Sequence, residues 1–239
     1  MEAGPVDLPP VLLLHGIGAN SLHWRHQFAG LADRFRLIAW NAPGYLLSDN
    51  LRVETPSCRD YAHALDDLLT ALGIDGFNVV ANSFGTRVAQ SFAYHRPGRI
   101  RRAVFTGTSI PRALSPEERA RSVEARARMI EHGGYSFGER AAALLGSAAT
   151  EDTLALVQHT LRATNLAGFM QAARFIAQAE MPPLAAGLTM SLLMVQRRGR
   201  PRHSGFDKCR IACCSAASRP PGHARRLRPP AGGGVPVPR

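Results

Sequence analysis

The segment from residue 77 to residue 95 constrains this chain more than any other. An apolar run at 77–80 leads into Ala81-Asn82-Ser83-Phe84-Gly85, and a helical pattern continues from Phe84 to His95. A serine at a sharp turn from strand to helix has a strained backbone, so the residues two before and two after it must be small, as Ala81 and Gly85 are. The pattern predicts an open α/β sheet with the Ser83 hydroxyl at the carboxyl end of a strand, where ligands bind in such folds.

Short apolar runs alternate with amphipathic stretches, which predicts a mostly parallel sheet with helices on both faces. The predicted strands are 11–15, 36–40, 77–82, 102–106 and 192–196. The predicted helices of this part are 22–33, 58–72 and 84–95. The second follows a Thr55-Pro56 start, and the third stops before Pro97.

Residues 115–179 contain no strand-like run. Capping-box patterns at Ser115–Glu118 and Ser136–Glu139, with amphipathic stretches at 151–162 and 166–179, predict helices there. The strand that returns at 192 favours an insertion over a separate helical domain. We therefore expect a core at 1–111, a helical cap at 112–186, a returning core strand at 187–196 and a tail at 197–239, in a three-layer α/β/α fold that is incomplete at both ends.

Two further motifs carry a resemblance to a known family. The apolar run 11–14 is followed by His15-Gly16-Ile17-Gly18, and the stretch 40–49 reads Trp-Asn-Ala-Pro-Gly-Tyr-Leu-Leu-Ser-Asp. The first resembles the oxyanion loop of the α/β-hydrolase family, and the second its Asp-x-Pro-Gly-x-Gly-x-Ser segment. Asn41 replaces the usual aspartate, and Leu46 or Leu47 occupies the place of the second glycine. The resemblance covers about residues 8–196.

The resemblance implies a role for each matching residue. Ser83 would attack a carbonyl group, and the backbone N–H groups of Ile17 and Phe84 would bind the oxyanion. The implied activity is hydrolysis of a small ester or related carbonyl compound, with carbon–carbon bond cleavage left open. No cofactor and no metal ion are implied. Trp24, His23 and Met170 are candidates for the pocket wall, with ordinary core packing as the alternative.

The catalytic acid and base are missing where the family has them. A serine nucleophile needs a histidine, oriented by an acid, and the family order is Ser, Asp or Glu, then His. The predicted strand 192–196 is followed by Arg197-Arg198-Gly199-Arg200. Asp207 and His223 occur in the right order, but neither follows a strand. A zinc site made of His203, Cys209, Cys213, Cys214 and His223 would match no common ligand spacing.

A reading-frame shift after Gln196 accounts for this tail. Arginine outnumbers lysine strongly in the chain, which suggests GC-rich coding. Codons for residues 197–205 exist that, read one base later, give Gly-Glu-Ala-Asp-Arg-Val-Thr-Pro, which resembles the family's acid segment. The same step turns 226–236 into Gly-Cys-Gly-His-Leu-Pro-Glu-Val-Glu-Tyr, which resembles its histidine loop. We expect the tail to be disordered and turnover to be impaired.

The charge distribution bears on the other function classes. The net charge is +11, and residues 197–239 hold 11 of the 29 basic residues but a single acid, Asp207. The rest of the chain is near neutrality, so we expect a small-molecule substrate and no specific nucleic-acid partner, although an arginine-rich tail that binds nucleic acid is one alternative. A non-catalytic ligand-binding member of the fold is another. We expect no membrane partner and a cytoplasmic location, since neither a signal peptide nor a long apolar run is evident. The oligomeric state is left open.

Overall fold

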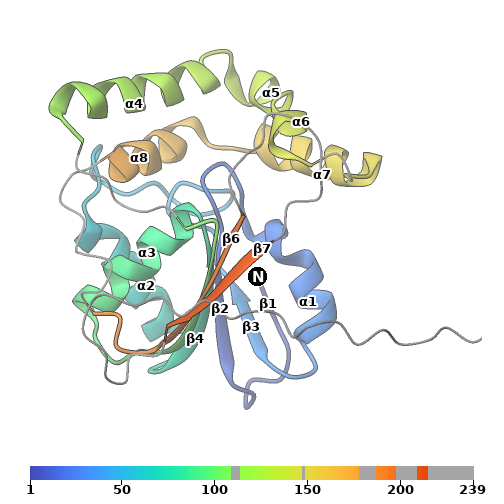
Figure 1. Cartoon of the computed structure of the whole chain (residues 1–239), viewed down its shortest axis with the longest axis vertical. Helices are drawn as coiled ribbons and strands as arrows, with labels where there is room; N and C mark the ends of the chain where they lie inside the picture. The colour runs from blue at the N-terminus through green and yellow to red at the C-terminus, as the bar shows by residue number, and fades with distance from the viewer. Residues whose placement is uncertain (109–113, 147–148, 178–186, 198–208, 215–239) are drawn as a thin grey trace, which may run out of the picture.

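The computed structural model describes residues 1–108, 114–146, 149–177, 187–197 and 209–214. The strands form a mixed sheet in the order β1-β3-β2-β4-β5-β6-β7. Its parallel strands are β2 (Pro10–Leu14), β3 (Arg36–Ala39), β4 (Phe77–Asn82), β5 (Ile100–Thr106) and β6 (Ser191–Arg197). Each of these was predicted within a few residues, and the mostly parallel α/β architecture is confirmed (Figure 1).

The two edges of the sheet differ from the prediction. At one edge, β1 (Glu2–Ala3) pairs antiparallel with β3, and the terminal amine of Met1 donates to the Ala39 carbonyl at 2.8 Å. A strand of two residues has no periodicity that a sequence could reveal. At the other edge, β7 (Cys209–Cys214) pairs antiparallel with β6. These six residues belong to the segment predicted as a disordered tail, and here they pair with the backbone of β6 through a ladder of hydrogen bonds.

Alternate residues of the central strands face opposite layers of the molecule. Val11 and Leu13 of β2 pack with Trp24 and with α1 (Arg25–Leu31) on one face. Leu12 and Leu14 belong to the larger core on the other face, under α2 (Cys58–Ala71) and α3 (Phe84–His95). Helices thus cover both faces, as expected for parallel strands that are buried on both sides.

The helix α2 shows how the local sequence fixes a boundary. The Ser57 hydroxyl accepts a hydrogen bond from the Asp60 backbone, and the Asp60 carboxylate accepts one from the Ser57 backbone at 2.7 Å. This reciprocal pair starts the helix. Tyr61, Leu65 and Leu69 then recur every four residues and are fully buried against the sheet.

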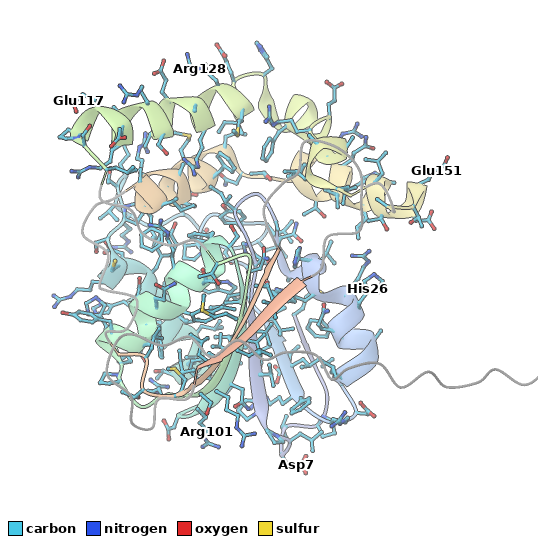
Figure 2. The ribbon with its side chains drawn as sticks, viewed as in Figure 1. Asp7, His26, Arg101, Glu117, Arg128 and Glu151 are labelled. Atoms are coloured by element: carbon cyan, nitrogen blue, oxygen red, sulfur yellow. The ribbon has the colours of Figure 1, made fainter. Side chains whose placement is uncertain are left out.

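Helices fill the described part of the chain between β5 and β6 and lie over one end of the sheet (Figure 1). They are α4 (Pro116–Ile130), α5 (Gly133–Gly138), α6 (Ala141–Leu144), α7 (Glu151–Arg162) and α8 (Leu166–Ala177). The limits predicted for this insertion, residues 112 and 186, lie outside the described residues. Figure 2 shows Glu117 and Arg128 on the outer side of α4, pointing away from the sheet.

The two predicted capping boxes had different outcomes. Ser115 and Glu118 form the complete reciprocal pair at the start of α4. The second prediction is wrong, because Ser136 lies inside α5, whose first residue, Gly133, is a left-handed glycine with φ of 83°. That glycine lets the chain turn from α4 into α5 without a polar side-chain cap.

The helix α8 is fixed to the core by backbone contacts. The Gln171 amide donates to the carbonyls of Leu51 and Val53, both at 2.7 Å, and accepts from the Leu51 backbone at 3.2 Å. Gly44 and Gly168 lie so close that a side chain on either would overlap the other's backbone. The loop after β3 and the helix α8 therefore form one packed unit. None of the helices in the described residues is long and apolar enough to cross a membrane.

Candidate functional site

Ser83 occupies the sharp turn between β4 and α3. Its φ of 47° and ψ of −108° lie outside the regions that L-residues normally adopt. Hydrogen bonds hold this conformation: the Ser83 N–H donates to the Thr106 carbonyl at 3.0 Å, and the Thr86 N–H and hydroxyl donate to the Ser83 carbonyl at 3.0 and 2.6 Å. The hydroxyl of Ser83 is therefore presented by a strained turn that its neighbours stabilise.

The residues that flank the turn leave it no room for larger side chains. Ala81 is fully buried in β4. A Cβ atom on Gly85 would lie 2.8 Å from the carbonyl oxygen of His15 and closer still to that of Leu14. Since both oxygens belong to the backbone, neither can move aside cheaply. The start of α3 therefore depends on glycine at this position, as the sequence predicted.

The loop after β2 passes directly over this turn. A Cβ atom on Gly16 would lie 2.8 Å from the side-chain oxygen of Asn82 and 3.5 Å from the Ser83 Cβ. Asn82 itself donates to the hydroxyl of Thr106 at 2.9 Å, which ties the end of β4 to β5. Gly18 has a φ of 75° and faces Phe137 of α5 and Leu161 of α7.

The two predicted oxyanion donors lie at this junction. Phe84 is the first residue of α3, so its N–H has no partner within the helix. Ile17 follows Gly16 in the loop above Ser83 and lines the same pocket as Ser83. Among the described residues, neither N–H donates a hydrogen bond to another group. The part of the chain that the structure describes therefore leaves both N–H groups without an acceptor.

His15 is a structural residue of this loop. Its Nε2 accepts from the Ala42 N–H at 3.1 Å, so its Nδ1 carries the proton and donates to the Gly16 carbonyl at 2.8 Å. Complete burial lowers the pKa of His15 to about 4, and the imidazole is neutral at pH 7. His15 thus connects the loop over Ser83 to the loop after β3.

The loop after β3 tolerates both departures from the family pattern. The Asn41 side chain accepts from the Ser21 N–H at 2.9 Å, which is an acceptor role that aspartate could also play. Leu46 has a φ of 48°, whereas Leu47 is not among the left-handed residues and is 99% exposed. Leu46 therefore holds the position where the family has its second glycine, and it does so in a conformation that suits glycine.

A pocket of about 390 Å³ opens above Ser83. One wall comes from the loop after β2, the η1 turn (Ser21–Trp24) and the end of β4, and the opposite wall comes from α6 and α7. The lining residues are Gly16, Ile17, Gly18, Ala19, Leu22, His23, Arg25, Asn82, Ser83, Leu144, Leu145, Leu156, Val157, Thr160 and Leu161. The structure thus brings Ser83 together with the predicted loop residues and with His23.

Two predicted pocket residues lie elsewhere. Trp24 is 4% exposed and packs in the core between β2, β3 and α1, because the η1 turn directs it toward the sheet while His23 faces the pocket. Met170 packs against a hydrophobic cluster of the helices between β5 and β6, which contains Phe137 and Phe169. Sequence reasoning missed Arg25 and the α6–α7 residues. Val157 and Leu161 are apolar residues four positions apart in α7, and this spacing could have indicated that one face of α7 is buried toward the pocket.

Within the described ranges, no three His, Cys, Asp or Glu side chains gather as a metal site. Asp207, His223 and His203 lie outside the described residues. Cys209, Cys213 and Cys214 belong to β7. The end of β6, where the family has its acid, leads into Arg198-Gly199-Arg200 in the sequence, which contains no carboxylate.

Comparison with known proteins agrees with this geometry. An uncharacterized protein of Mycobacterium tuberculosis is 41% identical over 97 residues, which are 41% of this chain and 28% of that protein. Epoxide hydrolase 1 of Caenorhabditis elegans is 31% identical over 124 residues, covering 46% of this chain and 31% of the relative. The chain therefore matches less than a third of the length of either relative.

A solved structure of a thermophilic esterase from Thermogutta terrifontis superimposes with a TM-score of 0.71 at 22% identity, over 82% of this chain and 73% of the esterase. At that identity the likeness shows the fold. The family model described as the alpha/beta hydrolase fold matches residues 9–133, which is just over half of the sequence. From the strained serine turn, the loop above it and this match together, the chain belongs to the alpha/beta hydrolase fold family.

Proposed function

We propose that this chain acts on a small ester or related carbonyl compound through Ser83. The observation that carries the proposal is that Ser83, held at a positive φ, lines one pocket with the Ile17 loop. The Ser83 oxygen attacks the carbonyl carbon, and the oxyanion binds the N–H groups of Ile17 and Phe84. The alcohol leaves with a proton, and water then hydrolyses the acyl enzyme to release the acid.

The pocket wall fits the apolar part of such a substrate. Leu144, Leu145 and Leu156 contribute to its cap side, and Leu22 to its core side. A volume of about 390 Å³ lies within the range of small-molecule sites. The apolar lining would bury an acyl or alcohol group while the polar loop holds the carbonyl oxygen.

Turnover of this chain is proposed to be impaired. Ser83 needs a base, and His15 cannot serve because both of its ring nitrogens are engaged and it lies buried beneath the loop. Without an acid and base, hydrolases of this kind keep only the rate that the oxyanion hole and binding supply, about 10³- to 10⁴-fold over water. We attribute the loss to the reading-frame shift after Gln196.

A fluorophosphonate probe tests both halves of the proposal. We expect slow labelling at Ser83 that disappears in Ser83→Ala and persists in Ser91→Ala. Ser91 is the matched control, because it lies on α3, the helix that follows Ser83, and its hydroxyl donates to the Arg87 carbonyl at 2.8 Å. Labelling that survives in Ser83→Ala would refute the nucleophile. Labelling as fast as that of an intact serine hydrolase would refute the impairment. A chain that binds esters tightly but is never labelled would instead be a non-catalytic binding protein.

A further inference from the structure

Arg25 is the one charged residue in the pocket wall that the structure describes. It is the first residue of α1 and lines the same pocket as Ser83, whereas no Asp or Glu of the described residues does. The neighbouring His23 adds no positive charge near neutral pH, since burial and the Arg25 guanidinium lower its pKa. The pocket is therefore apolar over much of its surface, with a positive charge in one place.

Arg25 also has no counter-ion among the residues that the structure describes. In the described residues, Arg36 pairs with Glu2 at 2.6 Å, Arg174 with Glu54 at 2.9 Å, and Arg96 with Asp66 at 2.6 Å. Within the described residues, the Arg25 side chain forms neither an ion pair nor a hydrogen bond, although the residue is partly buried. An arginine in a pocket wall without a carboxylate beside it offers charge-assisted hydrogen bonds to an incoming group, so the site favours binding an anion.

Hydrogen bonds hold the backbone between the Ile17 loop and Arg25 in place. The Asn20 side chain accepts from the Leu22 N–H at 3.0 Å, and the Asn41 side chain accepts from the Ser21 N–H at 2.9 Å. These bonds hold the short turn that connects Ala19 to Arg25. The Ile17 loop and Arg25 thus belong to one continuous segment, and both ends of that segment line the pocket.

We propose that Arg25 binds a carboxylate at the end of the substrate remote from the carbonyl that Ser83 attacks. This rests on the proposed function of the Ser83 pocket and narrows its substrates to half-esters of short dicarboxylic acids. A guanidinium binds a carboxylate through two parallel charge-assisted hydrogen bonds, and the leucines of the cap wall would cover the methylene chain between the two ends. Arg25 is a specificity residue here and takes no part in the bond-breaking step.

Binding to the full-length Ser83→Ala chain tests the proposal without relying on turnover. Monomethyl adipate and dimethyl adipate have the same carbon skeleton but differ by one negative charge. By calorimetric titration we expect the monoester to bind about 10- to 100-fold more tightly, as a charge-assisted contact allows. Adding Arg25→Gln should remove this preference, and Arg25→Lys should keep part of it. Arg34→Gln, outside the pocket on the loop after α1, is the matched control and should leave the preference unchanged.

The outcomes separate the specificity from the catalysis. Equal affinity for the two esters, no binding of either, or a preference that survives Arg25→Gln would overturn the role of Arg25. A preference that depends on Arg25, in a wild-type chain that fluorophosphonate never labels, would support Arg25 and refute Ser83 as a nucleophile. Thermal unfolding of each variant verifies that the folded protein is being compared.

Discussion

The carboxyl ends of β4 and β6 lie at the same end of the parallel sheet, but they differ in the residues that follow them. At the end of β4, the main chain builds the site: Ser83 is held at a positive φ, and Gly16 passes over it. The end of β6 leads into arginines and a glycine, with no carboxylate in the position that the family uses. The strained turn at Ser83 depends on the residues next to it in the sequence. An acid or a histidine supplied by a later segment can be lost without changing that turn.

The largest effect is expected from restoring the residues that should follow β6. Expressing the gene with a one-base shift after the Gln196 codon should supply the missing acid and histidine. We expect kcat for a small ester to rise by at least about 10³-fold, because the base and its orienting acid act on Ser83 together. Steady-state hydrolysis of both versions gives the answer. An early stop codon in the shifted frame, or the absence of Asp and His codons from it, would dismiss the explanation.

At the end of β4, Gly16→Ala should show how strictly the main chain is placed. The added methyl group would lie 2.8 Å from the Asn82 side-chain oxygen, so the loop must move away from Ser83. We expect phosphonylation of Ser83 to slow by about 10²- to 10³-fold, the usual cost of one lost oxyanion donor. Gly30→Ala is the control, since its added methyl group would meet no other atom within 4 Å. Equal rates for the two variants would mean that the loop plays no part.

The third test uses pH to disturb the histidine that supports this loop. The pKa of His15 is about 4 in the folded chain, below its ordinary value of 6.5, so the unfolded chain binds the proton more readily. Stability contributed by neutral His15 is therefore complete above pH 6.5 and is lost as the pH falls toward 4.

We expect that loss to reach about 3 kcal/mol, at 1.36 kcal/mol for each unit of pKa difference. Urea unfolding at pH 7 and at pH 4.5 measures it, and His15→Asn should respond to the change of pH by correspondingly less. If the two proteins lose the same stability between these pH values, His15 does not depend on being neutral.

The smallest effect is expected on stability, from relieving the backbone strain at Leu46, which lies outside the pocket wall. Leu46→Gly replaces a left-handed leucine with the residue that suits its φ of 48°. We expect stability to rise by about 0.5–1 kcal/mol, since the relief of strain exceeds the added freedom of glycine in the unfolded chain. Leu47→Gly should give no gain. Urea midpoints that shift equally in both variants would show that exposure, rather than φ, decides the result.

The sequence predicted what depends on local pattern. The strands β2 to β6, the helices α2, α3 and α7, and the capping box of α4 follow from periodicity and from residues typical of helix starts. The positive φ of Ser83 and the need for glycine at position 85 follow from the strand-to-helix turn. These features involve neighbours in the chain, so a short segment contains the information.

Features that depend on distant partners escaped prediction. β1 and β7 form only because β3 and β6 offer them an edge, and their own residues show little pattern. Trp24 and His23 are adjacent, and the tertiary position of the η1 turn decides that His23 faces the pocket while Trp24 enters the core. The role proposed for Arg25 could not be inferred from the sequence, because the absence of a counter-ion among the described residues is a property of the folded molecule.

The attachment of α8 to the core has a consequence for how substrate range can change during evolution. Gln171 bonds to the main chain of Leu51 and Val53, and α8 contributes no residue to the pocket wall. Substitutions in α6 and α7 can therefore reshape the pocket while the contacts that hold α8 to the core stay intact. Selection could change the ligands that the pocket accepts without losing the fold, because different helices line the pocket and hold the insertion in place.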